Sequence, residues 1–91
     1  MKRLNDRQKL FAVCLVLHQS HHDMTIYEIG QKIGFKTGRP VQKTLDTLHQ
    51  AGLLRGWQAV INTGNTATYW RLARHVWERM ERDGVAETVE Q

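Results

Sequence analysis

The sequence is poor in features that mark several common protein classes. It has one cysteine and one proline in 91 residues, and 8% of its side chains are aromatic. Cys14 has no second cysteine with which to form an internal disulfide, so the sequence predicts a protein of the reducing cytoplasm. The longest apolar run, residues 10–17, is far shorter than the roughly 20 residues of a membrane-spanning helix. The N-terminus lacks a small-residue cleavage site, so we expect neither a signal peptide nor a membrane partner.

Residue patterns that carry catalysis are also lacking. The sequence has no glycine-rich phosphate loop, no nucleophile motif around Cys14 and no evident pair of buried carboxylates. We therefore expect a protein that is not an enzyme and needs no cofactor. The content of 41% hydrophobic and 24% charged residues is typical of a folded chain, and 91 residues suffice for one small domain. We predict a single domain over residues 1–91, in which residues 85–91 form a frayed tail.

Positive charge is concentrated in the middle of the chain. Residues 32–74 hold seven Lys or Arg residues and a single carboxylate, Asp46, whereas residues 75–91 hold two Arg residues and five carboxylates. The whole chain has a formal net charge of +4. A basic segment beside an acidic one points to a polyanionic partner that meets one surface of the molecule, and a solvated charged face is the alternative.

Capping residues divide the first half of the chain into helices. Apolar residues recur at helical spacing after the pair Asn5-Asp6, either of which suits an N-cap. Thr25 followed three residues later by Glu28 is a capping box. It predicts a second helix over about residues 26–32, which Gly34 ends in a left-handed turn.

A third helix is predicted over residues 37–51. Pro40 fits the first turn of a helix, because its missing N–H is not needed there. Apolar residues then follow at helical spacing, and Gly52 ends the helix. Since only a few residues separate this helix from the second one, the two form a helix-turn-helix unit.

After Gly52 the apolar period changes from helical to alternating, which predicts a hairpin over residues 53–73. A turn at Gly64-Asn65 gives these pairs: Ile61 with Thr68, Ala59 with Trp70, and Trp57 with Leu72. A three-residue loop would shift the register and exchange the two faces. The pairs place Trp57 and Trp70 on an apolar face, and Trp77 falls on the apolar stripe of a closing helix. We therefore predict that all three indoles are in the core and that Tyr69 is the exposed aromatic residue.

The chain resembles the winged helix-turn-helix family, with the closest likeness to small bacterial and phage transcription regulators of the MarR-like kind. The likeness is carried by "IYEIGQKIGFKTGRPVQKTLDTLHQAGLLRGW" and by the helix end "L-x-x-A-G-L-L", and with the hairpin it covers about residues 24–73. It implies an α+β fold, mainly helical, with three helices, a β-hairpin wing and a C-terminal helix. It also implies binding of double-stranded DNA, with helix 37–51 in the major groove and hairpin 53–73 as the wing.

The resemblance assigns DNA contacts to the outward positions of the third helix and to the hairpin. The predicted contacts are Lys36, Thr37, Gly38, Arg39, Gln42, Lys43, Thr47, Arg55, Asn62, Asn65 and Arg71. Gln42 suits bidentate pairing with adenine, and Arg39 or Lys43 suits guanine or phosphate. Asp46, which phosphates would repel, is expected to neutralise Arg39 or Lys43. The wing tip departs from the family because it carries no Lys or Arg, so we expect backbone contact there rather than deep minor-groove recognition.

Other partners and functions remain open from the sequence. RNA polymerase or another regulator is a candidate partner, and so is a second copy of the chain, which would pair through the first helix or the Trp77/Met80 face of the last. The main alternative function is a winged-helix module that binds proteins in a transcription or replication complex. A weaker one is a metal-responsive switch, because zinc-binding side chains cluster at Cys14, His18, His21 and His22. A polar helix end explains these histidines equally well, and the spacing is not that of a structural zinc site, so we predict no metal.

Overall fold

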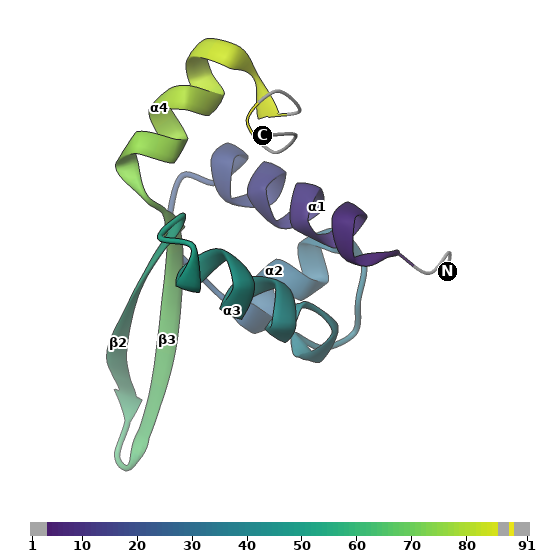
Figure 1. The fold of residues 1–91 in the computed structure, drawn as a ribbon. Coiled ribbons are helices and arrows are strands. Elements are labelled where there is room, and N and C mark those ends of the chain that lie inside the picture. The colour runs from purple at the N-terminus through teal and green to yellow at the C-terminus, as the bar shows by residue number, and fades with distance from the viewer. Residues whose placement is uncertain (1–3, 86–87, 89–91) are drawn as a thin grey trace.

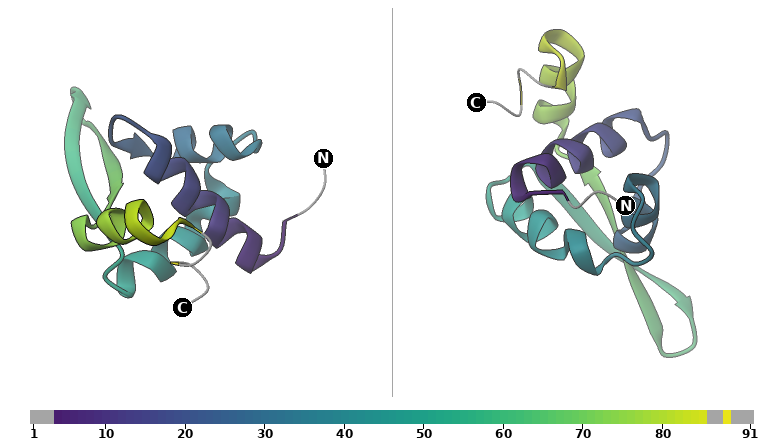
Figure 2. Two further views of the ribbon diagram at one scale, coloured as in Figure 1. Left: turned by 90° about the horizontal axis from the view of Figure 1, so that it is seen from above. Right: turned by 90° about the vertical axis from the view of Figure 1, so that its right-hand side faces the viewer.

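The computed structural model describes residues 4–85 and 88, and over these residues the chain is an α+β winged helix-turn-helix (Figure 1). Its elements in chain order are α1 (Asp6–Gln19), β1 (Met24–Thr25), α2 (Ile26–Ile33), the 3₁₀ turn η1 (Arg39–Val41), α3 (Gln42–Gln50), β2 (Leu54–Asn62), β3 (Asn65–Leu72) and α4 (Arg74–Asp83). The helices gather at one end, and the β2–β3 hairpin, here called the wing, extends away from them (Figure 2). The predicted fold class is confirmed.

The first two helices begin where their capping residues predict. Asn5 accepts a hydrogen bond from the Gln8 amide at 2.8 Å, and Gln8 Oε1 accepts one from the Asn5 amide at 2.9 Å. Thr25 and Glu28 form the same reciprocal pair at 3.2 and 3.1 Å. Each box satisfies two amides that a helix start leaves without partners. Gly34 ends α2 with φ of +117°, the left-handed conformation expected of it.

The third helix begins later than predicted. Residues 39–41 form a 3₁₀ turn, in which the Val41 amide donates to the Gly38 carbonyl at 3.1 Å, and α-helical hydrogen bonding starts only at Gln42. The physical reason is Pro40, which disfavours the α conformation at the residue before it and lacks a donor of its own. Thr37 and Gly38 therefore belong to the turn of the helix-turn-helix unit rather than to α3.

Two glycines allow α2 to pack closely against that turn. A Cβ on Gly30 would lie 2.3 Å from the Thr37 carbonyl oxygen, and a Cβ on Gly38 would lie 2.8 Å from the backbone of Ile26. Real Cβ atoms do not approach other atoms so closely, so both positions require glycine for steric reasons. The sequence reveals the short connection between the helices but not this contact.

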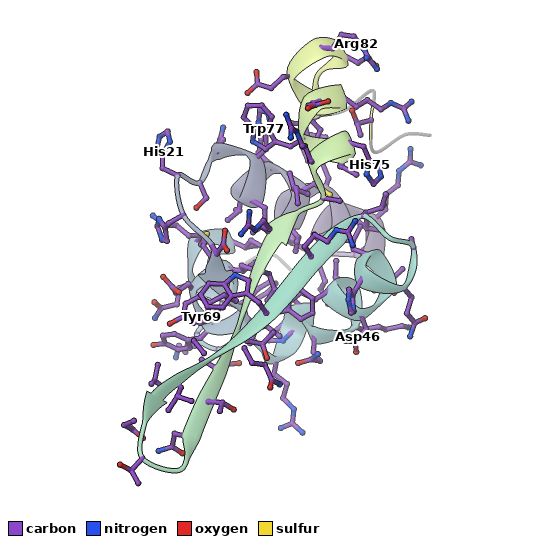
Figure 3. The ribbon with its side chains drawn as sticks, turned by 90° about the vertical axis from the view of Figure 1, so that its left-hand side faces the viewer. His21, Asp46, Tyr69, His75, Trp77 and Arg82 are labelled. Atoms are coloured by element: carbon purple, nitrogen blue, oxygen red, sulfur yellow. The ribbon has the colours of Figure 1, made fainter. Side chains whose placement is uncertain are left out.

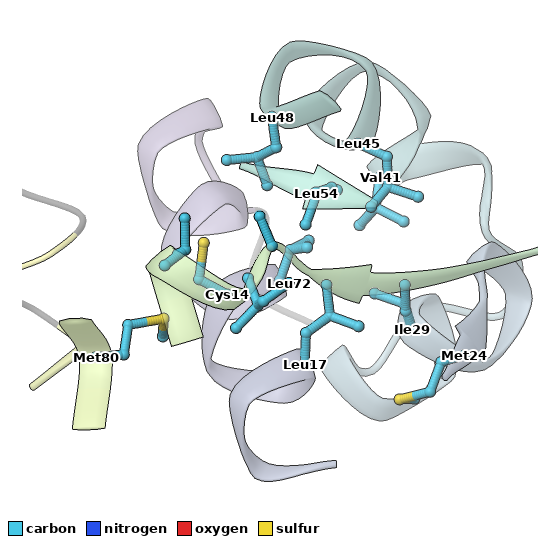
Figure 4. Packing of buried hydrophobic residues seen from close by; sticks show 13 residues of the cluster. Cys14, Leu17, Met24, Ile29, Val41, Leu45, Leu48, Leu54, Leu72 and Met80 are labelled. Carbon is cyan, nitrogen blue, oxygen red and sulfur yellow. The ribbon is translucent and has the colours of Figure 1, made fainter. Parts of the chain in front are cut away.

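A single apolar core joins all the helices to the base of the wing (Figure 4). It consists of Val13, Cys14, Leu17, Met24, Ile29, Val41, Leu45, Leu48, Leu54, Leu72, Ala73, Val76 and Met80. The inner face of α3 is thus fixed by burial, and its outer face is left to solvent. Met80 is buried within this chain, so of the Trp77/Met80 face proposed for a second copy only Trp77 is accessible.

The predicted register of the wing is wrong. Leu54 pairs with Leu72 and Trp57 with Tyr69, three residues away from the predicted pairing, and the turn consists of Thr63 and Gly64. Gly64 supplies the positive φ of +79° within this turn, and a register irregularity between Val60 and Asn62 precedes it on β2. Because the shift is an odd number of residues, it moves the side chains of β2 to the opposite face, while those of β3 keep their predicted faces.

The structure also corrects the predicted placement of two tryptophans, Trp57 through the register shift and Trp77 through the position of α4. Trp57 is 45% exposed and stacks on Tyr69, and Trp77 is 42% exposed on α4, so neither is a core residue. Trp70 does pack against the core, in the space that Gly56 opposite it leaves free. The sheet therefore has a core face, which carries Trp70, and an outer face, which carries Trp57 and Tyr69.

Strand β1 was not predicted from the sequence. Its two residues pair with β3, Met24 with Trp70 and Thr25 with Tyr69, so the sheet has the order β1-β3-β2. Two residues are too few to show an alternating pattern. The strand ties the segment between α1 and α2 to the base of the wing.

The frayed tail predicted for residues 85–91 lies mostly outside the described residues. Of the two that are described, Val85 packs against the core, and the Thr88 hydroxyl donates to the Gly84 carbonyl at 2.9 Å. Within the described ranges, none of the helices combines the length and apolarity needed to cross a bilayer.

Candidate nucleic-acid interface

The outer face of α3 is a polar surface beside the helix-turn-helix turn. The exposed residues of α3 include Gln42, Lys43, Asp46 and Thr47. The buried residues of the same helix are Thr44, Leu45 and Leu48. Lys36, Thr37 and Arg39 are exposed in the turn that precedes the helix. The structure therefore brings seven of these residues onto one continuous stretch, here called the α3 surface: Lys36, Thr37, Arg39, Gln42, Lys43, Asp46 and Thr47.

The cations of the α3 surface are available to an external anion. Within residues 4–85 and 88, no carboxylate forms an ion pair with Lys36, Arg39 or Lys43. The Arg39 amide donates to Thr37 Oγ1 at 3.3 Å, so this amide is satisfied internally and the Thr37 hydroxyl keeps its own proton to donate. Three unpaired cations at the start of one helix form a favourable surface for phosphates.

The sequence predicted that Asp46 pairs with Arg39 or Lys43, and this prediction is wrong. Its Oδ1 instead accepts a hydrogen bond at 3.1 Å from Nε2 of Gln42, one turn earlier on the same helix. A neutral amide is therefore the partner, and the two nearby cations keep their full charge. The bond also fixes the orientation of the Gln42 amide, whose oxygen and second N–H remain free for a ligand.

Gly38 is placed differently from the other predicted contacts. It is buried against Ile26 and not on the surface, so its contribution is the close approach of the turn to α2. A side chain at position 38 would push the turn away from α2 and would not reach a ligand.

The four predicted contacts on the wing do not join the α3 surface. Arg55 and Arg71 lie directly opposite each other in the sheet, on the outer face with Trp57 and Tyr69. The core face of the same strands is the one turned toward α3, since Trp70 contacts His49 of α3 with ring centroids 5.2 Å apart. Asn62 and Asn65 are exposed at the wing tip and hydrogen-bonded to each other.

The histidines and the cysteine do not gather into a metal site. No three His, Cys, Asp or Glu side chains among residues 4–85 and 88 are placed to hold a metal ion. His18 Nε2 lies 3.2 Å from Glu81 Oε1, and its ring packs against Trp77. His22 Nε2 lies 3.7 Å from Glu28 Oε2, so these two histidines face carboxylates of different helices.

Cys14 is buried in the core, and loss of hydration raises the pKa of its thiol to about 11. Between the pKa of the unfolded chain, near 9, and this value, the unfolded state loses a proton that the folded state keeps. We expect the free energy of unfolding to decrease over that interval by about 2 kcal/mol more in the native protein than in Cys14→Ala. Urea unfolding at a series of pH values measures this difference. Equal slopes for the two proteins would contradict the burial of the thiol.

Comparison with known proteins supports the fold alone. No protein-family model matches the chain, and no curated protein matches it significantly. Among solved structures, the chain is similar to one from Methanosarcina mazei Go1 described as a "possible transcriptional regulator", with a TM-score of 0.62. The sequences are 11% identical, and the match covers 97% of this chain and 68% of that protein. What the two share is the architecture.

One group of exposed residues was not predicted from the sequence; it lies on the outer face of the sheet and at the start of α4. Trp57 and Trp77 were expected in the core, and Arg74 was counted only as part of the basic segment. The alternative register with exchanged faces was the signal that would have found them, because it exposes Trp57 beside Arg55 and Arg71.

Proposed function

We propose that this protein binds double-stranded DNA through the α3 surface and acts as a small transcriptional regulator. The observation that carries the proposal is a set of three cations, Lys36, Arg39 and Lys43, that pair with no carboxylate of the described residues and lie beside Gln42 on the exposed face of a helix-turn-helix. An α-helix fits the major groove, where Arg and Lys bind guanine or phosphate and Gln binds adenine. The architecture shared with a protein described as a "possible transcriptional regulator" adds weak support.

The proposed mechanism is occupancy of a DNA site. Helix α3 enters the major groove, the flanking cations bind phosphates, and Asn62 and Asn65 at the wing tip donate to the backbone. Arg55 and Arg71 are left out of this set because they lie on the sheet face turned away from α3. One such unit buries limited surface, so specific affinity calls for two copies on adjacent half-sites.

Binding to random-sequence duplex DNA, followed by fluorescence anisotropy, tests the proposal first. With the three cations of the α3 surface on phosphates, the slope of log affinity against log salt is about −2.7, so affinity falls about 40-fold between about 50 and 200 mM salt. Absence of binding at the lowest salt would contradict DNA binding. The protein-interaction module would then be the remaining candidate, and exposed Val60 and Ile61 at the wing tip would be its first suspected contacts.

A further inference from the structure

The outer face of the sheet lines an open groove of about 1150 Å³ at the base of the wing. Its walls come from three parts of the chain: the loop between α1 and β1, the two wing strands, and the first turns of α4. The lining residues that matter here are His21, Arg55, Trp57, Arg71, Arg74 and Trp77. None of the described residues that line the groove belongs to α3 or to the turn before it, and in Figure 3 His21 lies on the opposite side of the view from Asp46 of α3. The groove is therefore separate from the α3 surface.

Three guanidinium groups converge on this groove. Arg55 and Arg71 occupy directly paired positions of an antiparallel ladder, where like charges destabilise a sheet. Arg71 Nε is held by Asp23 Oδ2 at 3.3 Å, and Arg74 Nε by Glu78 Oε1 at 2.9 Å. For Arg55, the described part of the chain supplies no such carboxylate. Among the described residues, Arg55 is therefore the arginine of this groove that has no paired carboxylate, and it lies beside two arginines that do.

The groove also presents flat aromatic surfaces. Trp57 stacks on Tyr69 with ring centroids 4.9 Å apart and planes 20° apart, and its indole N–H donates to Asp23. With one ring face covered and the nitrogen bonded, the exposed part of this indole is a fixed apolar plane. Trp77 of α4 lines the same groove and is similarly exposed. Fixed aromatic planes bind other flat rings with little loss of conformational entropy.

We propose that this groove is a binding site for a small organic anion that carries a flat ring. Its carboxylate or phosphate is bound by Arg55, with Arg71 and Arg74 as neighbouring donors, and its ring packs on Trp57. Arginine suits both groups because its fork matches two oxygens at once. The volume is slightly above the roughly 300–1,000 Å³ that is usual for small-molecule sites. A nucleic-acid strand fits less well, since its successive phosphates would meet Asp23 and Glu78 as well as the arginines.

Titration followed by nuclear magnetic resonance of the indole N–H groups tests this site. The probes are adenosine 5′-monophosphate and benzoate, which present a phosphate and a carboxylate, with neutral adenosine and benzamide as matched controls. We expect at least one anion to shift the Trp57 resonance saturably, with half-saturation below about 10 mM. The Trp70 resonance, on the core face, is an internal control that should move less. Whichever anion binds identifies the acidic group that the site accepts.

Two variants show whether the residues act as stated. Arg55→Gln should weaken binding of the active probe at least tenfold, and its exposed position leaves the fold intact. Arg39→Glu combined with Lys43→Glu, on the α3 surface, should leave the affinity unchanged, so the outcome is independent of DNA binding. The proposal is overturned if neither anion shifts Trp57 more than Trp70, if the neutral analogue binds as tightly as its anion, or if Arg55→Gln binds like the native protein.

Discussion

Replacing Arg39 and Lys43 together with glutamate is expected to lower the affinity for duplex DNA at least about 100-fold at moderate salt. Both side chains are exposed on the α3 surface and have no internal ion pair within residues 4–85 and 88. The change removes two cations that we place on phosphates or bases, and it adds two carboxylates that phosphates repel. Anisotropy with the same duplex, before and after the change, measures the loss.

The matched control reverses the same amount of charge elsewhere. Arg79 and Arg82 lie on α4, where they pair with Asp83, and Figure 3 shows Arg82 at the end of the molecule far from Asp46. Arg79→Glu with Arg82→Glu alters net charge by the same four units and should weaken binding far less. If both double variants lose affinity equally, only net charge matters and α3 is not the recognition helix. Circular dichroism should show the native helix content for both proteins.

Replacing Gly30 with alanine is expected to destabilise the protein by about 1–3 kcal/mol, or to prevent folding. In an ordinary helix the same change stabilises by about 1 kcal/mol, because alanine has the better helix propensity. Here the new Cβ would lie 2.3 Å from the Thr37 carbonyl oxygen, so α2 and the turn would have to separate. The opposite sign of the effect is therefore the signature of the close approach.

Thermal unfolding of Gly30→Ala measures this, since 1 kcal/mol corresponds to about 4–8 °C in a domain of this size. Lys32→Ala, at an exposed position of the same helix, is the control and should change the melting temperature little. A melting temperature of Gly30→Ala at or above that of the native protein would show that α2 and the turn are not packed as described.

The features predicted correctly from the sequence depend on residues close together in the chain. A cap at Asn5 or Asp6, the pair Thr25 with Glu28, and Gly34 each begin or end a helix through contacts within one turn, so the local pattern is sufficient. The reciprocal bond of Asn5 with Gln8 was not predicted. The winged helix-turn-helix fold follows from the order of these elements. The start of α3 was predicted too early, at residue 37 instead of Gln42, because the effect of Pro40 on the conformation of the residue before it was not considered.

The register of the wing could not be obtained in the same way. A turn at Thr63-Gly64 instead of Gly64-Asn65 shifts the pairing by two residues, and the irregularity between Val60 and Asn62 adds the third, which exchanges the faces of β2. This register buries Leu54 and Leu72 together at the base of the wing, in a core that α1, α3 and α4 share and that no local pattern contains. An error of an odd number of residues then placed Trp57 in the core and left its surroundings unrecognised.

The two candidate sites differ in the same respect. The α3 surface is readable from sequence because helical periodicity separates its exposed residues from the buried ones. The outer-face groove is assembled from segments far apart in the chain; the hydrogen bond from Trp57 to Asp23 alone spans 34 positions. Such a site becomes visible only when the strand register and the position of α4 are known.

The wing is supported along only part of its length. The short strand β1 pairs with β3 at Trp70 and Tyr69, and beyond these residues the hairpin is a two-stranded ribbon with no third strand beside it. Such ribbons have little stability of their own in water. The base of the wing is therefore held in place by β1 and Asp23, whereas the part toward Val60 and the turn is free to bend. The distal half of the wing can adapt its curvature to the surface it meets while the base keeps its position.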